Sequence, residues 1–118
     1  MSLRWLVAAL ILLGLLASAH MYNLAHHVYF ERWWMDIPMH LLGGLAIGTL
    51  FVGLSPRPRP LLFLVAVLLI SIGWELFEYV FGTTYSNTNY LFDTSHDLLD
   101  DVIGAAVAYG IARTSIWR

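Results

Sequence analysis

Apolar residues along this chain are grouped into four long segments, which short polar or aromatic stretches separate. The segments cover about residues 3–21, 37–54, 60–81 and 97–116. Each has close to the ~20 residues that a helix needs to cross the hydrocarbon core of a bilayer. Because a bilayer offers no water to pair with backbone groups, helices are the economical structure for such segments. The pattern therefore predicts an all-α polytopic membrane protein, a four-transmembrane-helix bundle.

The segment 24–34, between the first two apolar segments, has a different character. Its aromatic residues, among them Tyr29, Trp33 and Trp34, are of the kind that gather at headgroup level. We expect this segment to lie in the membrane interface rather than to cross the bilayer.

The first apolar segment also has features of a secretory signal peptide. Arg4 precedes the apolar run, and Ala17, Ser18 and Ala19 form an A-x-A pattern typical of a cleavage site. We expect a retained membrane helix, and the alternative is removal of the segment before His20.

Composition agrees with a membrane location. Hydrophobic residues make up 59% and charged residues 12% of the 118 residues, and the mean hydropathy is +0.71. Soluble domains average roughly 45–50% apolar and about 25% charged residues. The length predicts one domain, a single transmembrane domain over residues 1–118. The net charge of −2, without lysine or a basic run, argues against nucleic acid as a partner, and the absence of cysteine excludes thiolate chemistry.

The arginines define an orientation. If all four segments cross the bilayer, five of the six arginines fall on the side of the termini: Arg4, Arg57, Arg59, Arg113 and Arg118. Only Arg32 falls on the other side. Because cytoplasmic loops carry the excess of basic residues, we expect both termini to be cytoplasmic. Membrane lipids are the expected partners.

The same topology gathers the acidic residues and histidines on the opposite, periplasmic or extracellular side. Asp36 and His40 begin the second apolar helix and share a face because they are four residues apart. Glu75 and Glu78 share a face near the end of the third helix. The fourth helix begins with the stripe Asp93, Asp97 and Asp100, flanked by His96 and Asp101.

A bound metal ion is the simplest way to accommodate so many carboxylates in one place. An acid near the bilayer centre costs on the order of 2.5–3.5 kcal/mol, and neighbouring carboxylates repel one another or hold protons. We expect a divalent metal, and Mn, Mg, Zn and Fe all accept carboxylate and imidazole ligands. The expected metal ligands are Asp36, His40, Glu75, Glu78 and Asp97. The expected catalytic residues, as bases or as groups that orient the ligands, are Asp93, His96 and Asp100.

Less specific roles remain as alternatives. For the whole cluster these are a proton or ion relay and a solvated group of helix-end charges. Asp93 has the alternative of capping the fourth helix, and Asp101 that of facing the headgroups. His20, His26 and His27 are expected to be interfacial side chains.

These motifs resemble those of a family of small bacterial membrane proteins. The resemblance rests on Asp36-x-x-x-His40 followed by Leu42-Gly43-Gly44, on Trp74-Glu-Leu-Phe-Glu78, and on Asp93-Thr-x-x-Asp97 before Gly104-Ala105. In this order the motifs, within residues 36–108, are similar to the YjdF-like proteins and more distantly to the VanZ-like group. The resemblance implies a polytopic inner-membrane protein but no particular activity. It implies site roles for Asp36, His40, Glu75, Glu78, Asp93 and Asp97.

The leading hypothesis for function is a metal-dependent membrane hydrolase that acts on a lipid or lipid-linked phosphate at the outer leaflet. Carboxylate and imidazole ligands can hold ions that polarise a phosphoryl oxygen and generate hydroxide. In the loop 82–92, Tyr85 and Tyr90 are expected to position the headgroups.

Two alternatives belong to other functional classes. The first is a divalent-cation or proton-coupled transporter or binding module. It would act as a homo-oligomer, with subunits packed through Gly44 and Gly48 or through Gly104 and Ala108. The second is a structural accessory protein of a larger membrane complex.

Overall fold

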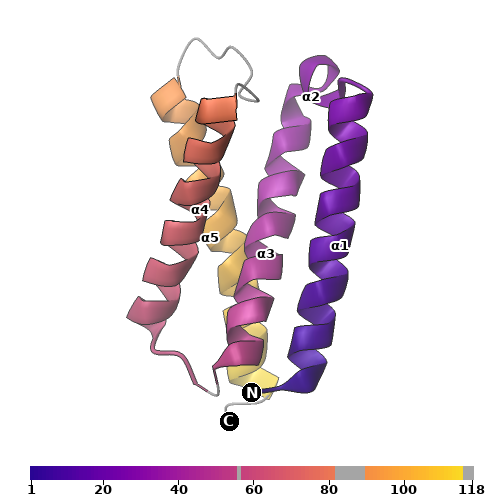
Figure 1. The fold of residues 1–118 in the computed structure, drawn as a ribbon. Helices are drawn as coiled ribbons and strands as arrows, with labels where there is room; N and C mark the ends of the chain where they lie inside the picture. The colour runs from indigo at the N-terminus through magenta and orange to yellow at the C-terminus, as the bar shows by residue number, and fades with distance from the viewer. Residues whose placement is uncertain (56, 82–89, 116–118) are drawn as a thin grey trace.

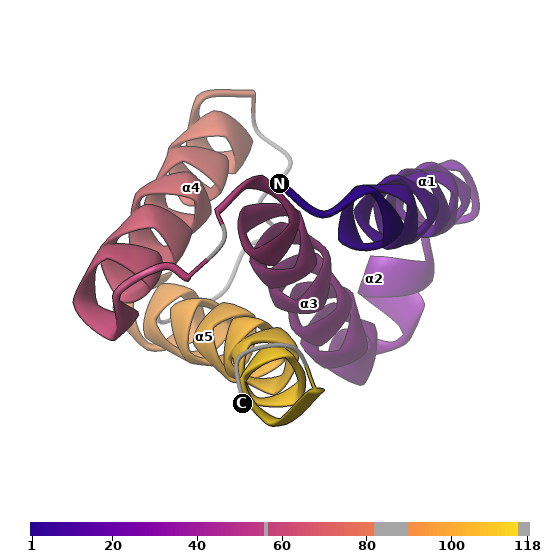
Figure 2. The same ribbon diagram turned by 90° about the horizontal axis from the view of Figure 1, so that it is seen from below.

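The computed structural model describes residues 1–55, 57–81 and 90–115, and every regular element within these ranges is helical. Four long helices run side by side, and two short ones lie at one end of the bundle (Figures 1 and 2). The long helices are α1 (Leu3–Ala25), α3 (Asp36–Leu54), α4 (Pro60–Phe81) and α5 (Tyr90–Ser115). The short ones are α2 (Val28–Glu31) and the 3-10 helix η1 (Trp33–Met35). The all-α class predicted from the sequence is confirmed.

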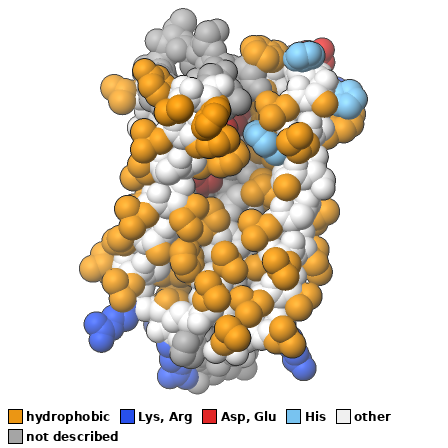
Figure 3. Space-filling model, viewed as in Figure 1, with side chains coloured by type: hydrophobic (Ala, Val, Ile, Leu, Met, Phe, Trp, Pro, Cys, Tyr) orange, Lys and Arg blue, Asp and Glu red, His pale blue; other side chains and the backbone are white. Residues whose placement is uncertain are grey.

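Three of the described helices are long and apolar enough to cross a membrane. Their most apolar stretches have mean hydropathies of 1.9 in α1, 1.8 in the segment Trp33–Leu54 and 2.2 in α4. Helix α5 has 26 residues, but the aspartates in its first half lower its mean hydropathy. Hydrophobic side chains cover much of the visible surface in Figure 3, and several arginine side chains gather at its lower end. Such a surface suits a protein whose solvent is largely lipid.

Helix α5 extends further than its apolar part. It begins at Tyr90, about two turns before the apolar segment expected from residue 97. Asp93 therefore lies in the first turn of the helix and not at the N-cap position that was its alternative role. Carboxylates in a first turn complement the positive end of the helix dipole, which favours helix there although the residues are polar.

The chain between α1 and α3 forms a compact corner. Helix α1 continues past the expected end at Met21 to Ala25, and Asn23 in its last turns is buried. His27 adopts a left-handed conformation, with φ of 56°, and turns the chain into α2. The segment expected to lie in the interface thus forms α2 and η1 at one end of the bundle (Figure 1).

Helix α3 lies between α1 and α5, and α4 packs mainly on α5 (Figure 2). Glycines bring the backbones of α3 and α5 into contact. A Cβ atom added at Gly44 would clash with the carbonyl of Asp101, and one added at Gly104 would clash with the carbonyl of Leu41. Only residues without a side chain permit so close an approach of two helices.

The small residues that were expected to join subunits are used inside one chain. Gly44, Gly48, Gly104 and Ala108 are all buried, and a Cβ at Gly48 would lie 2.8 Å from the Cα of Ala105. The contact between α3 and α5 within the chain therefore covers the surfaces that the oligomer hypothesis assigned to contacts between subunits.

The half of the bundle away from α2 has an apolar interior. Val52, Phe63, Val67, Ala105 and Ala112 form a buried cluster that joins α3, α4 and α5. At the same end, the N–H of Ser2 donates a 2.8 Å hydrogen bond to the carbonyl of Gly53, which fixes the start of α1 against the end of α3. These contacts leave the polar residues concentrated in the other half.

We predict that Gly104→Val lowers the free energy of unfolding by about 1–3 kcal/mol, because the added side chain forces α3 and α5 apart. Thermal unfolding of the protein in detergent measures the effect. Gly73→Val is the matched control, since a Cβ at Gly73 meets no atom within 4 Å. Equal melting temperatures for the two variants would contradict the close helix contact.

Candidate functional site

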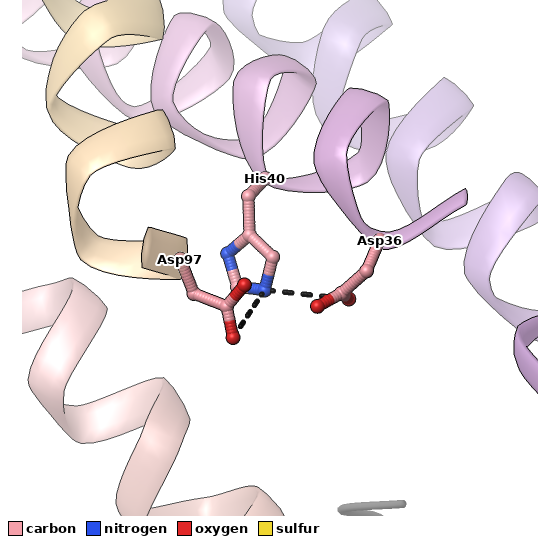
Figure 4. A group of neighbouring side chains, drawn as sticks. All are labelled: Asp36, His40 and Asp97. Carbon is pink, nitrogen blue, oxygen red and sulfur yellow. Dashed lines mark ion pairs between the residues drawn. The ribbon is translucent and has the colours of Figure 1, made fainter. Parts of the chain in front are cut away.

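The polar side chains of three helices meet in the half of the bundle that carries α2. The first turns of α3 contribute Asp36 and His40, the last turns of α4 contribute Glu75 and Glu78, and α5 contributes Asp97. His40 is 6% exposed and points between Asp36 and Asp97, as Figure 4 shows. The structure therefore brings together all five residues that the sequence analysis proposed as metal ligands. We call these five residues and Asp101 the carboxylate–histidine cluster.

One ring nitrogen of His40 is held by a residue that the sequence analysis placed elsewhere. Nδ1 lies 3.1 Å from Oδ1 of Asp101, whose side chain is buried. A carboxylate accepts a hydrogen bond, so Nδ1 carries a proton, and in the neutral imidazole Nε2 presents its lone pair to the centre of the cluster. The expectation that Asp101 faces the headgroups is wrong. It follows Asp97 by one helical turn and lies on the face of α5 that contacts Gly44.

The second ring nitrogen of His40 faces three carboxylates. Nε2 lies 3.5 Å from Oδ1 of Asp36, 3.6 Å from Oδ2 of Asp97 and 3.9 Å from Oε1 of Glu75. These distances exceed the usual 2.7–3.2 Å of an N–H···O hydrogen bond. The two shorter ones match the separation of about 3.3–3.6 Å expected between ligand atoms bound at roughly 2.0–2.2 Å to one tetrahedral ion.

The ligand atoms form two overlapping groups around His40. Asp36, His40 and Asp97 each offer one atom within 4.8 Å of the others, and so do His40, Glu75 and Glu78. Both groups contain the same imidazole, whose only nitrogen free of Asp101 is Nε2. A single ion beside Nε2 can therefore draw its ligands from either group.

Glu75 is the most constrained carboxylate of the cluster. It is 5% exposed, and its Oε2 accepts a 3.5 Å hydrogen bond from Oγ1 of Thr94. Its Oε1 is buried and accepts no hydrogen bond from the described residues. One turn deeper in α4, the buried hydroxyl of Ser71 is also without a partner among those residues. A buried oxygen without a donor is costly, so the position of Oε1 beside Nε2 points to a ligand between them.

Four carboxylates of the cluster share one imidazole. Asp36, Glu75, Asp97 and Asp101 each pair with His40, and none of these four pairs with an arginine among residues 1–55, 57–81 and 90–115. Several carboxylates around one imidazole repel one another unless they bind a cation or take up protons. A cation or added protons beside His40 would therefore lower the repulsion among these carboxylates.

The residues expected to be catalytic occupy different places. Asp100 is buried and lies with its Oδ2 3.0 Å from Nδ1 of His96. Because successive residues of a helix are 100° apart, Asp100 does not share the direction of Asp101 toward His40. The predicted stripe of aspartates is thus divided, because Asp97 faces His40 whereas Asp100 pairs with His96. Asp101, which was placed beside the stripe, faces His40 as well. Asp93 is partly buried, one turn before Asp97.

His20, which was expected to be an interfacial side chain, contacts the residue next to Glu75. His20 of α1 hydrogen-bonds through Nδ1 to the hydroxyl of Tyr29 at 2.9 Å, and its ring packs edge-on against Trp74 with centroids 5.4 Å apart. Residues 82–89, with Tyr85, lie outside the described residues. The side chain of Tyr90 is also outside them.

Fold and site together define a small helical membrane protein with a carboxylate–histidine cluster buried in one half of its bundle. The chain belongs to the family of predicted membrane proteins DUF2238, whose sequence model matches residues 1–117. The resemblance to YjdF-like proteins fits this family, and the more distant link to the VanZ-like group stays a prediction. No curated protein and no solved structure matches the chain.

We predict an energetic coupling of about 1.5–3 kcal/mol between His40 and Asp101, the value of a buried hydrogen bond to a charged group. This coupling is calculated from the unfolding free energies of the wild type, His40→Ala, Asp101→Ala and the double variant. A second cycle with Asp100→Ala is the control, because Asp100 is equally buried and adjacent but pairs with His96. The assignment is incorrect if both cycles give the same coupling.

Proposed function

We propose that this chain is an integral membrane metalloprotein that binds one divalent ion at Nε2 of His40. Asp36, Asp97 and Glu75 would complete the coordination, and Glu78 is close enough to replace one of them. The observation that carries this proposal is the buried Oε1 of Glu75, which accepts no hydrogen bond from the described residues and faces Nε2 at 3.9 Å. No other cation among the described residues is placed to neutralise it.

Asp101 has a separate role in this proposal. A metal-binding imidazole usually donates its other N–H to a carboxylate, which fixes the ring and raises its basicity. Asp101 stands in that relation to His40. The mixture of one imidazole with several carboxylates is compatible with Zn, Fe, Mn or Mg.

The reaction that this site supports best is hydrolysis of a lipid or lipid-linked phosphate. A divalent ion polarises a phosphoryl oxygen and generates hydroxide from bound water at neutral pH. The side chain of Asp36 is 36% exposed, against 6–7% for His40, Glu75 and Asp97, so a substrate would reach a bound ion most easily beside Asp36. Asp93, half-buried in the first turn of α5, is the residue of the predicted catalytic set best placed to accept a proton.

The interior below the cluster argues for this function over transport. Ser71 lies one turn below Glu75, and the apolar cluster around Val67 and Ala105 lies further along the bundle. Thr49 is buried but bonds to its own helix through the carbonyl of Leu45. An ion that left the cluster in this direction would find no continuous set of ligands, and transport therefore ranks second.

We further propose that α5 is the fourth crossing and that the site faces the periplasm or cell exterior. Arg4 at the start of α1, Arg57 and Arg59 between α3 and α4, and Arg113 near the end of α5 lie at the end of the bundle remote from the cluster. The positive-inside rule assigns that end to the cytoplasm of a bacterial inner membrane.

This orientation predicts that a reporter active only in the cytoplasm works when fused after Arg118. The same reporter inserted in the segment between α4 and α5 should be inactive, because that segment would lie outside. Reporter activity in bacterial cells measures both, and the reversed pattern would disprove the orientation.

For the site itself, we predict about one divalent ion per chain in protein purified without chelators, since ligands brought together by folding bind metal strongly. His40→Ala should lower the metal content to background. Asp101→Asn should weaken metal affinity by about 10–100-fold, because the imidazole loses its orienting carboxylate. Elemental analysis and metal titration in lipid nanodiscs measure these effects, together with phosphate release from phosphatidic acid.

The matched control is His96→Ala, which removes an imidazole from α5 outside the cluster and should leave the bound metal unchanged. Wild-type protein without a divalent ion would refute the proposal. Metal binding without phosphate release, combined with ion flux that Glu75→Gln abolishes in liposomes, would establish transport in place of hydrolysis.

A further inference from the structure

The carboxylate–histidine cluster has an opening on the side of the bundle. Helix α1 packs along α3, and α4 packs along α5, so that α1 and α4 stand apart (Figures 1 and 2). Figure 3 shows a recess between them, with acidic side chains visible inside and hydrophobic side chains on both flanks. In a bilayer, a recess on this side of the helices faces lipid.

An imidazole stands at the rim of this recess. His20 of α1 contacts Trp74 of α4, the residue next to Glu75. The hydroxyl of Tyr29 holds Nδ1 of His20. With the hydroxyl as donor, Nε2 carries the other proton, and Nε2 has no hydrogen-bond partner among the described residues. His20 can thus donate one hydrogen bond to an anion between α1 and α4.

We propose that the ligand of this site is a phospholipid with a phosphate monoester headgroup, which enters laterally between α1 and α4. The inference rests on the proposed metal site, because the unliganded carboxylates would repel a phosphate. The bound ion and Nε2 of His20 would hold the phosphate oxygens, while the acyl chains remain in the bilayer between the two helices. The phosphate headgroup of such a lipid suits the polar cluster inside the opening, and its acyl chains suit the hydrophobic flanks.

Photo-crosslinking in nanodiscs tests the lateral route. The probe is phosphatidic acid with a diazirine in one acyl chain, in a phosphatidylcholine bilayer containing Mn²⁺ or Zn²⁺. We expect crosslinks to concentrate on the facing sides of α1 and α4, and unlabelled phosphatidic acid to compete where glycerol phosphate does not. His20→Phe keeps the ring contact with Trp74 and should reduce this labelling about tenfold, the effect of losing one hydrogen bond to a charged group.

The matched control is His26→Phe, since His26 is exposed and bonds to the carbonyl of Tyr22 in its own helix. It should leave the labelling unchanged. Metal content is measured on the same samples. Bound metal with labelling spread evenly around the bundle, or unaffected by His20→Phe, would overturn the lateral route and leave the metal site intact. Concentrated labelling without bound metal would refute the metal site and, with it, the binding of the phosphate by an ion.

Discussion

The backbone contact between α3 and α5 at Gly44 and Gly104 determines how the polar residues of this protein meet. It places the carbonyl of Asp101 against one helix and that of Leu41 against the other, which fixes both the separation and the rotation of the pair. With that rotation fixed, the side chain of Asp101 reaches Nδ1 of His40, and the opposite nitrogen is directed toward α4. A contact made of glycines thus sets the orientation of an imidazole.

Electrostatics explains why the cluster lies near one end of the bundle. Carboxylates without partners are expensive at the centre of a bilayer and less so toward the headgroups. Asp36 and Asp93 lie in the first turns of α3 and α5, where the helix dipole also favours negative charge. Glu75 lies near the C-terminal end of α4, where the dipole opposes negative charge. Burial of the Glu75 carboxylate is therefore stabilised most by positive charge bound in the carboxylate–histidine cluster.

Much of this arrangement is present in the sequence. Hydropathy alone locates the apolar parts of the long helices, and helical spacing pairs Asp36 with His40 and Glu75 with Glu78. These inferences work because a span of given length and a spacing of three or four residues leave little choice of geometry. The grouping of these side chains around one point required only that three helices end on the same side.

The remaining features depend on packing that a single sequence does not specify. Two successive aspartates, Asp100 and Asp101, lie 100° apart on α5, and only the contact with α3 decides which of them faces His40. A signal was nevertheless present, since Asp101 follows Asp97 by four residues and precedes Gly104 by three. Small residues likewise indicate a close helix contact without saying whether the partner helix belongs to the same chain.

Helix α1 contributes no residue to the carboxylate–histidine cluster. The residues of the cluster come from α3, α4 and α5, whereas α1 attaches to α3 through contacts such as Ser2 with Gly53 and Leu16 with Gly43. Substitutions on the α4-facing side of α1 can therefore alter what reaches the cluster while its internal distances stay the same. The proposed lateral route is therefore bordered on one side by a helix that supplies no residue of the cluster.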